Sequence, residues 1–97
     1  MADNLAEQNN GVIMIREVDL HGTNNFFDAR MVIQDELLNA YNSDISELKF
    51  IHGHRGGTVY RDYIRHGKML RDAPAMMRDN LVIKKHGSGA TIVQFTN

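Results

Sequence analysis

Four short runs of β-branched and large apolar residues stand out along the chain, each bounded by glycine or polar residues. They lie at residues 12–20, 48–51, 81–85 and 91–95. Runs of this length and composition are typical of buried strands. In the first run we assign residues 17–21 to a strand, and residues 12–16 before them to strand as well. The turn formers Gly87, Ser88 and Gly89 predict that the last two runs pair as an antiparallel hairpin.

A helical repeat follows the first run. Its apolar positions recur at steps of three and four, at Phe26, Ala29, Ile33, Leu37 and Ala40. This spacing is typical of the buried side of an amphipathic helix. Asn24 or Asn25 is placed to accept hydrogen bonds from the amides of the first turn, and Asp28 suits the positive end of the helix dipole. We therefore expect a helix that begins at this cap and ends near Asn42.

A second helix is expected over residues 58–66, which have helical spacing and are followed by Gly67. Residues 68–78 are expected to add another helical turn. The order is then β-α-β-α-β-β. Strand–helix–strand units pair their strands in parallel, and the closing hairpin adds an antiparallel strand. The sequence predicts a two-layer α/β sandwich, in which two helices cover one face of a mixed four-stranded sheet.

Length and composition fit one small domain. The chain has 97 residues, of which 42% are hydrophobic and 24% charged, as in an ordinary globular fold with one core. We assign residues 1–11 to a flexible tail and residues 12–97 to the domain. The absence of cysteine excludes disulfides, thiolate catalysis and cysteine-bound metals. No apolar run approaches a membrane span and the first residues lack the order of a signal peptide, so we expect a cytoplasmic protein without membrane contact.

Charge is unevenly distributed, although the formal net charge is only −1. Residues 1–48 carry nine acidic and two basic side chains, whereas residues 49–71 carry six basic and one acidic. Positive potential is therefore concentrated on one segment, which can hold a polyanion even in a nearly neutral protein.

The first junction with candidate chemistry is Asp19-Leu20-His21-Gly22. Because side chains alternate along a strand, Asp19 and His21 are expected on the same side. A carboxylate beside an imidazole raises the pKa of the imidazole and fixes the ring, which gives a general base or a group that stabilises charge on a reacting phosphate. The simpler alternative is that Asp19 caps a turn and His21 bonds a carbonyl at the strand end.

The second junction is rich in glycine and precedes the second helix. It reads His52, Gly53, His54, Arg55, Gly56 and Gly57. Glycines before a helix N-terminus allow several backbone N–H groups to converge on one anion, such as a phosphate. Arg55 adds a bidentate donor. Arg61 and Arg65, four residues apart, extend a basic face along the helix, which Lys68 and Arg71 continue. The alternative is a tight turn beside a solvated basic face.

Histidines near the predicted junctions raise the question of a metal site. They are His21, His52, His54 and His86. No second chelating pair stands at an established spacing, so we expect no structural zinc. A catalytic Mg²⁺ or Mn²⁺ held by Asp19 and a substrate phosphate stays open, because magnesium needs few protein ligands.

Three junctions in this order resemble the motifs of the Smr (small MutS-related) domain family. The family has an L-D-L-H-G-type strand end, an H-G-x-G-x-G loop before a helix and a late G-S-G-A-T-type turn. This chain has Val18–Gly22, His52–Gly57 and Gly87–Thr91 in the same order, and the resemblance covers about residues 17–96. It implies a fold similar to the C-terminal domain of translation initiation factor three. It also implies a nucleic-acid-binding domain, often an endonuclease that nicks DNA or cleaves RNA.

The resemblance also implies roles for individual residues. Asp19 and His21 match the positions associated with cleavage. The residues His52, Gly53 and Gly57 match the loop at the nucleic-acid site. Around them we assign His54, Arg55, Gly56, Arg61 and Arg65 to nucleic-acid binding. Two positions depart from the motif, since Arg55 replaces its middle glycine and Gly56 stands where threonine is common.

The resulting hypothesis is an endonuclease that acts on phosphodiester bonds. The glycine loop and Arg55 hold the scissile phosphate, His21 activates a water, and Asp19 orients His21 or helps to hold a divalent ion. The main alternative is a module that binds branched, structured or single-stranded nucleic acid without cutting it. A third is an adaptor whose basic helix binds an acidic protein.

Overall fold

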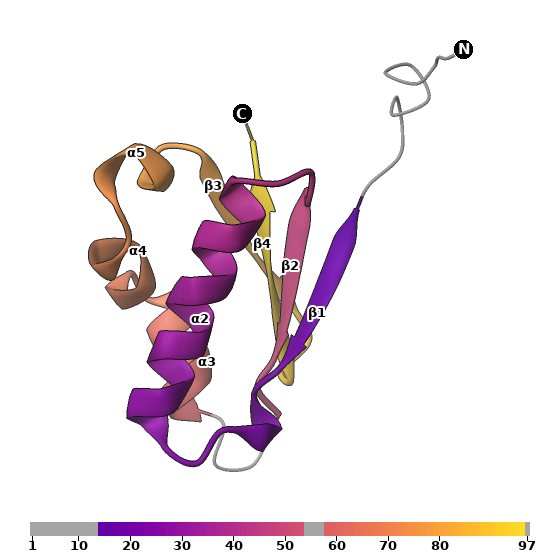
Figure 1. The fold of residues 1–97 in the computed structure, drawn as a ribbon. Coiled ribbons are helices and arrows are strands. Elements are labelled where there is room, and N and C mark those ends of the chain that lie inside the picture. The colour runs from indigo at the N-terminus through magenta and orange to yellow at the C-terminus, as the bar shows by residue number, and fades with distance from the viewer. Residues whose placement is uncertain (1–13, 54–57, 97) are drawn as a thin grey trace.

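The computed structural model describes residues 14–53 and 58–96 of the chain. In them, four strands form the predicted mixed sheet, in the order β1-β2-β4-β3 (Figure 1). The strands are β1 (Ile15–Asp19), β2 (Glu47–Ile51), β3 (Leu81–His86) and β4 (Ala90–Phe95). β1 and β2 are parallel, whereas β4 is antiparallel to both β2 and β3. The last residues of β1 and β2 and the first of β4 therefore lie at the same edge of the sheet.

The α-helices lie on one side of the sheet (Figure 1). They are α2 (Phe26–Tyr41), α3 (Thr58–Arg65), α4 (Lys68–Asp72) and α5 (Ala75–Arg78). The predicted number of covering helices, two, was wrong for the described part of the chain. Residues 68–78 form two further short helices rather than one helical turn. Pro74 separates them, since its missing N–H and its ring cannot continue a helix.

α2 follows the predicted repeat and cap. The Asn25 side chain accepts a hydrogen bond from the Asp28 backbone N–H at 2.9 Å, so Asn25 is the N-cap. The buried residues of this helix are Ala29, Ile33, Leu37 and Ala40. Ile33, Leu37 and Ala40 belong to one core cluster with sheet residues that include Leu48, Phe50 and Val93. The helix is thereby fixed across the sheet, with its N-terminus near the edge where β1 and β2 end (Figure 1).

The first strand ends earlier than predicted. β1 stops at Asp19, and the next residues form a 3₁₀ turn, η1 (Leu20–Gly22). The turn forms because the Asp19 carboxylate accepts from the His21 backbone N–H, which competes with extended chain. The predicted strand at 17–21 was therefore wrong in its last two residues. The predicted tail, residues 1–11, and the extended residues 12 and 13 lie outside the described residues.

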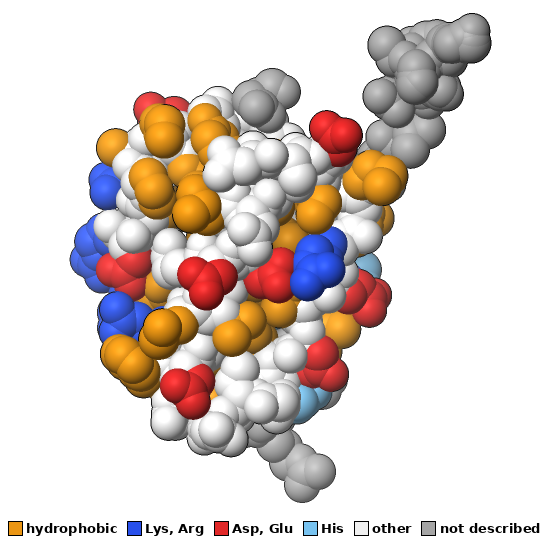
Figure 2. Space-filling view, in the orientation of Figure 1, with side chains coloured by type: hydrophobic (Ala, Val, Ile, Leu, Met, Phe, Trp, Pro, Cys, Tyr) orange, Lys and Arg blue, Asp and Glu red, His pale blue; other side chains and the backbone are white. Residues whose placement is uncertain are grey.

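Charged side chains are not mixed evenly over the visible face. Figure 2 shows carboxylates scattered over α2 and toward β1, while most of the visible Lys and Arg side chains gather along the outer edge of the helical layer, near α4.

No described helix combines the length and apolar character needed to cross a membrane.

Candidate functional site at the edge of the sheet

The described residues of the three sequence junctions meet at one edge of the sheet. Asp19, the last residue of β1, lies opposite Ile51, the last residue of β2. Ile51 in turn lies opposite Ala90, the first residue of β4. The segments that follow β1 and β2 are therefore neighbours, and the turn before β4 lies beside them.

Asp19 and His21 form an exposed pair. His21 Nδ1 lies 2.8 Å from Asp19 Oδ1, and both side chains are 62% exposed. The same carboxylate oxygen accepts from the His21 backbone N–H at 2.9 Å. Their proximity was predicted, but its cause is different: the η1 turn brings the two side chains together, not the alternation of side chains along a strand.

The pair has a defined polarity. Because Asp19 Oδ1 accepts, Nδ1 of His21 carries the proton, and Nε2 is the acceptor of the neutral ring. The hydrogen bond from the His21 backbone N–H lowers the pKa of Asp19 below its ordinary value of 3.8; desolvation opposes this shift and the contact with the His21 side chain adds to it. Asp19 is therefore ionised at neutral pH and orients a histidine that can accept a proton.

Gly53 brings the second strand end against this histidine. Its backbone has φ +80°, in the left-handed region that favours glycine. A Cβ atom at this position would lie 2.6 Å from His21 Nε2. Only glycine allows the chain to pass so close, so the basic atom of the pair lies directly beside the start of the glycine loop. Asp19, His21 and Gly53 together are called the edge site below.

His52, one residue earlier, has the opposite environment. It is only 2% exposed, with Nε2 2.9 Å from Thr91 Oγ1 and Nδ1 3.2 Å from the Gly53 carbonyl oxygen. Because that carbonyl can only accept, Nδ1 donates to it, and Nε2 pairs with the Thr91 hydroxyl. Arg65 Nε donates to Thr91 Oγ1 at 2.7 Å. The Arg65–Thr91–His52 network thus holds the Gly53 peptide in place.

The two arginines predicted on the basic helix face are used differently. Arg65 Nη2 donates to the carbonyls of Gly87 and Ala90, both at 2.7 Å, and so fixes the turn between β3 and β4. Burial lowers the pKa of Arg65, and the nearby charge of Arg61 adds to this shift. Arg61 Nε lies 3.2 Å from Asp62 Oδ1, with a side chain that is 31% exposed. Arg65 therefore holds the turn beside the site, whereas Arg61 contacts its neighbour on the same helix.

Two backbone amide groups of the glycine junction form hydrogen bonds within the fold. The backbone N–H groups of His52 and Gly53 both donate to the Gly89 carbonyl, at 3.0 and 2.9 Å. These two amides therefore face the turn before β4 rather than an anion. The other residues assigned to the loop, His54, Arg55, Gly56 and Gly57, lie outside the described residues. The binding of a phosphate by converging backbone N–H groups stays a prediction about these four residues.

Sequence reasoning missed the contribution of the third junction. It was expected to be a hairpin turn alone, but its Gly89 carbonyl and Thr91 hydroxyl hold the strand end that carries His52 and Gly53. The available signal was Thr91 itself, a hydroxyl at the second position of a buried strand, where an apolar side chain would otherwise pack.

The described residues contain no group of three or more His, Asp or Glu side chains placed to hold a metal ion. A single carboxylate such as Asp19 suits a hydrated Mg²⁺ that is shared with a phosphate. A divalent ion of that kind stays a prediction.

Comparison with known proteins gives no match, whether to family models, curated proteins or solved structures. The function must therefore be argued from the edge site and from the three motifs that meet there.

Proposed function

We propose that this chain is a nucleic-acid-binding domain of the Smr type that hydrolyses phosphodiester bonds in DNA or RNA. The observation that carries the proposal is the exposed Asp19–His21 pair, with His21 Nε2 beside Gly53. The order of the three motifs supports the family, and with it a fold similar to the C-terminal domain of translation initiation factor three. The mixed sheet with helices on one side is compatible with that fold.

The chemistry follows from the polarity of the pair. His21 Nε2 takes a proton from a water molecule as the water oxygen forms a bond to phosphorus and the bond to the leaving sugar oxygen breaks. That sugar oxygen takes a proton from solvent. Asp19 holds the His21 ring in the required tautomer and stabilises the imidazolium that forms. A Mg²⁺ or Mn²⁺ bound by Asp19 and the phosphate would supply further neutralisation of negative charge.

The simpler interpretation of Asp19 as a turn cap explains only part of the geometry. Asp19 does cap η1, through the His21 backbone N–H. Capping does not require the second hydrogen bond from the ring, nor a ring that is 62% exposed. A histidine kept only for structure would gain more from burial, as His52 shows. The ring bond and the exposure of the pair favour a chemical role.

The test is incubation of the purified chain with supercoiled plasmid and with structured RNA, each with and without Mg²⁺ or Mn²⁺. We expect nicked plasmid or cleaved RNA, and loss of cleavage in Asp19→Asn. The matched control is Asp35→Asn, which removes another exposed acid, on α2 away from the edge site. Cleavage that survives in Asp19→Asn contradicts the assigned role.

The second candidate, a module that binds without cutting, is favoured by exposed basic side chains outside the edge site, at Lys68 and Arg71. Their contribution to binding does not need the Asp19–His21 pair. Wild-type protein that retains the plasmid or RNA in a gel-shift assay but leaves it intact with either metal identifies this module. Capture of a protein partner that survives nuclease treatment, without nucleic-acid binding, identifies the adaptor instead.

A further inference from the structure

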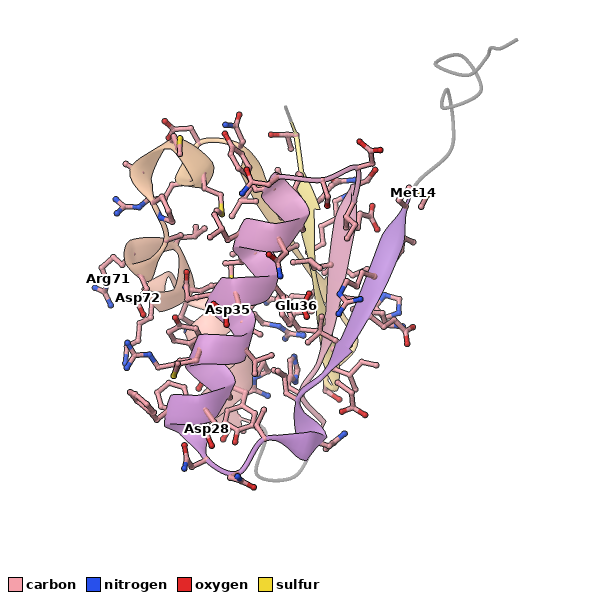
Figure 3. The ribbon with its side chains drawn as sticks, in the orientation of Figure 1. Met14, Asp28, Asp35, Glu36, Arg71 and Asp72 are labelled. Atoms are coloured by element: carbon pink, nitrogen blue, oxygen red, sulfur yellow. The ribbon has the colours of Figure 1, made fainter. Side chains whose placement is uncertain are left out.

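A groove runs between α2, α3 and α4, and none of its lining residues belongs to the edge site. One part, of about 210 Å³, is lined by Phe26, Arg30, Tyr63, Lys68, Arg71 and Asp72. An adjoining part of about 350 Å³ shares Phe26, Tyr63 and Lys68. We call these two hollows together the helix groove. Figure 3 shows Arg71 and Asp72 on α4, at the outer edge of the helical layer.

Flat side chains form the interior of the helix groove. The Phe26 ring meets Tyr63 edge-on, with 5.5 Å between centroids, and lies nearly parallel to Tyr60 at 6.1 Å. The Arg30 guanidinium lies over Phe26 and Tyr63, at 5.9 and 5.8 Å from their centroids. Aromatic rings and guanidinium planes are the surfaces on which unpaired nucleobases stack.

The rim of the groove keeps an excess of positive charge. Asp72 is already engaged, since Oδ2 accepts from Tyr63 Oη at 2.8 Å and from Arg30 Nη2 at 3.3 Å. Lys68 and Arg71 are exposed on α4, and their side chains form no ion pair with a described residue. Basic side chains gather on this edge of the molecule in Figure 2. Such a rim suits a phosphate group.

The helix groove begins next to the turn that carries His21. Thr23 caps the C-terminus of η1, and its hydroxyl lies 3.4 Å from Tyr60 Oη. Tyr60 in turn lies beside Phe26, which lines both parts of the groove. Two side-chain contacts therefore connect the turn of the edge site to the lining of the helix groove.

We propose that the helix groove binds an unpaired nucleotide that flanks the scissile bond. Its base packs against the exposed Arg30 guanidinium, which Phe26 supports from beneath, and its phosphate contacts Lys68 and Arg71. Bases inside a duplex are already stacked and cannot enter. The inference rests on the proposed function and specifies its substrate, a nucleic acid with a single-stranded segment beside the bond that is cut.

The test compares two fluorescent hairpins in an anisotropy titration of the whole chain, one with a single-stranded overhang and one blunt. We expect the overhang to tighten binding at least about fivefold, as for one stacked base. Phe26→Leu should remove most of this gain. The matched control is Phe27→Leu, which changes the adjacent Phe, 64% exposed and outside the groove lining. A gel run after each titration checks that the probe is intact.

A double variant covers the case in which Phe26→Leu does not fold. Lys68→Ala with Arg71→Ala should reduce the overhang preference and lower the salt slope for the overhang probe by about one to two. The control, Lys84→Ala with Lys85→Ala, removes the same charge from exposed residues of β3 and should keep the preference.

The outcomes separate the two proposals. Equal affinity for both hairpins overturns the groove, as does an equal loss of preference in the Lys68/Arg71 and Lys84/Lys85 variants. Cleavage by the wild type without an overhang preference leaves the proposed function standing and the groove wrong. An overhang preference without cleavage leaves the groove standing and the proposed function wrong. No binding to either probe overturns both.

Discussion

Two histidines follow neighbouring parallel strands at the same edge of the sheet, yet their surroundings differ. His21 is exposed, paired through Nδ1 with Asp19. His52 is buried, with Nε2 beside Thr91 and Nδ1 beside the Gly53 carbonyl. The His21 ring is largely exposed, whereas the His52 ring uses both nitrogens within the fold.

The difference in exposure indicates that His21 acts in the chemistry and that His52 supports the structure of the site. An exposed imidazole oriented by a carboxylate can exchange a proton with a substrate or water. A buried imidazole cannot reach a substrate, but it fixes the Gly53 peptide that passes beside His21. Changes at the exposed pair should therefore alter the cleavage rate, and changes in the buried network should alter the free energy of unfolding.

The largest effect is expected at His21. His21→Gln removes the proton acceptor, and we expect a decrease of about 10² to 10⁴ in the cleavage rate, the usual contribution of general acid–base catalysis. The melting temperature should stay close to that of the wild type, because the side chain is 62% exposed. Single-turnover cleavage and thermal melting by circular dichroism measure the two quantities. A variant that melts early but cleaves normally would reverse the roles given to the two histidines.

A smaller effect on rate, joined to a loss of stability, is expected at Gly53. Gly53→Ala places a Cβ 2.6 Å from His21 Nε2 and strains a backbone at φ +80°. We expect the His21 ring to shift and the cleavage rate to fall about tenfold or more. The strained backbone should also lower the free energy of unfolding by about 1–3 kcal/mol.

The matched control for this change is Gly87→Ala. Gly87 has a similar φ of +72°, but nothing lies within 4 Å of its Cβ position. It should lose comparable stability in urea unfolding and keep its cleavage rate. Equal rates in the two variants would show that the approach of Gly53 to His21 has no catalytic consequence.

The buried half of the comparison is tested at Thr91, which is fully buried. Thr91→Val keeps the shape but removes the hydroxyl shared by His52 Nε2 and Arg65 Nε. We expect about 1–3 kcal/mol less stability in urea unfolding, the usual result when buried polar groups lose a partner. Thr96→Val, at an exposed threonine, controls for the substitution itself. Cleavage per folded molecule should fall less than in His21→Gln, and a larger decrease would make the buried network part of the chemistry.

The elements that sequence predicted well are those with local signals. The Asn25 cap and the spacing from Ala29 to Ala40 define α2 without any tertiary information. The two short helices α4 and α5 have too few residues for a periodic pattern, and helices of that length need tertiary packing to form. Met69 and Met77, both fully buried, supply that packing.

The candidate site divides in the same way. The spacing of Asp19 and His21 was enough to predict a pair, although the pair was expected from the alternation of a strand and the turn that forms it was only the alternative. The partner of His52 lies 39 residues away, at Thr91, and only the antiparallel pairing of β2 with β4 brings the two together. Arg65 was assigned to a basic face that binds nucleic acid, because helical spacing does not show which cation donates to a neighbouring turn.

The smallest expected effect is on acid stability, and it tests the exposed pair alone. The His21 backbone N–H lowers the pKa of Asp19 in the folded state below its ordinary value of 3.8. As the pH falls, the Asp19 carboxylate of the unfolded chain is therefore protonated before that of the folded chain. The stabilisation is present at higher pH and is lost as the pH falls through the lowered pKa. Urea unfolding at about pH 5 and about pH 3 should therefore show a steeper loss in wild type than in Asp19→Asn, whereas Thr91→Val should follow the wild-type slope. Parallel curves for wild type and Asp19→Asn would mean that the η1 turn is not held by Asp19 in solution, and the orientation of His21 would then lack its support.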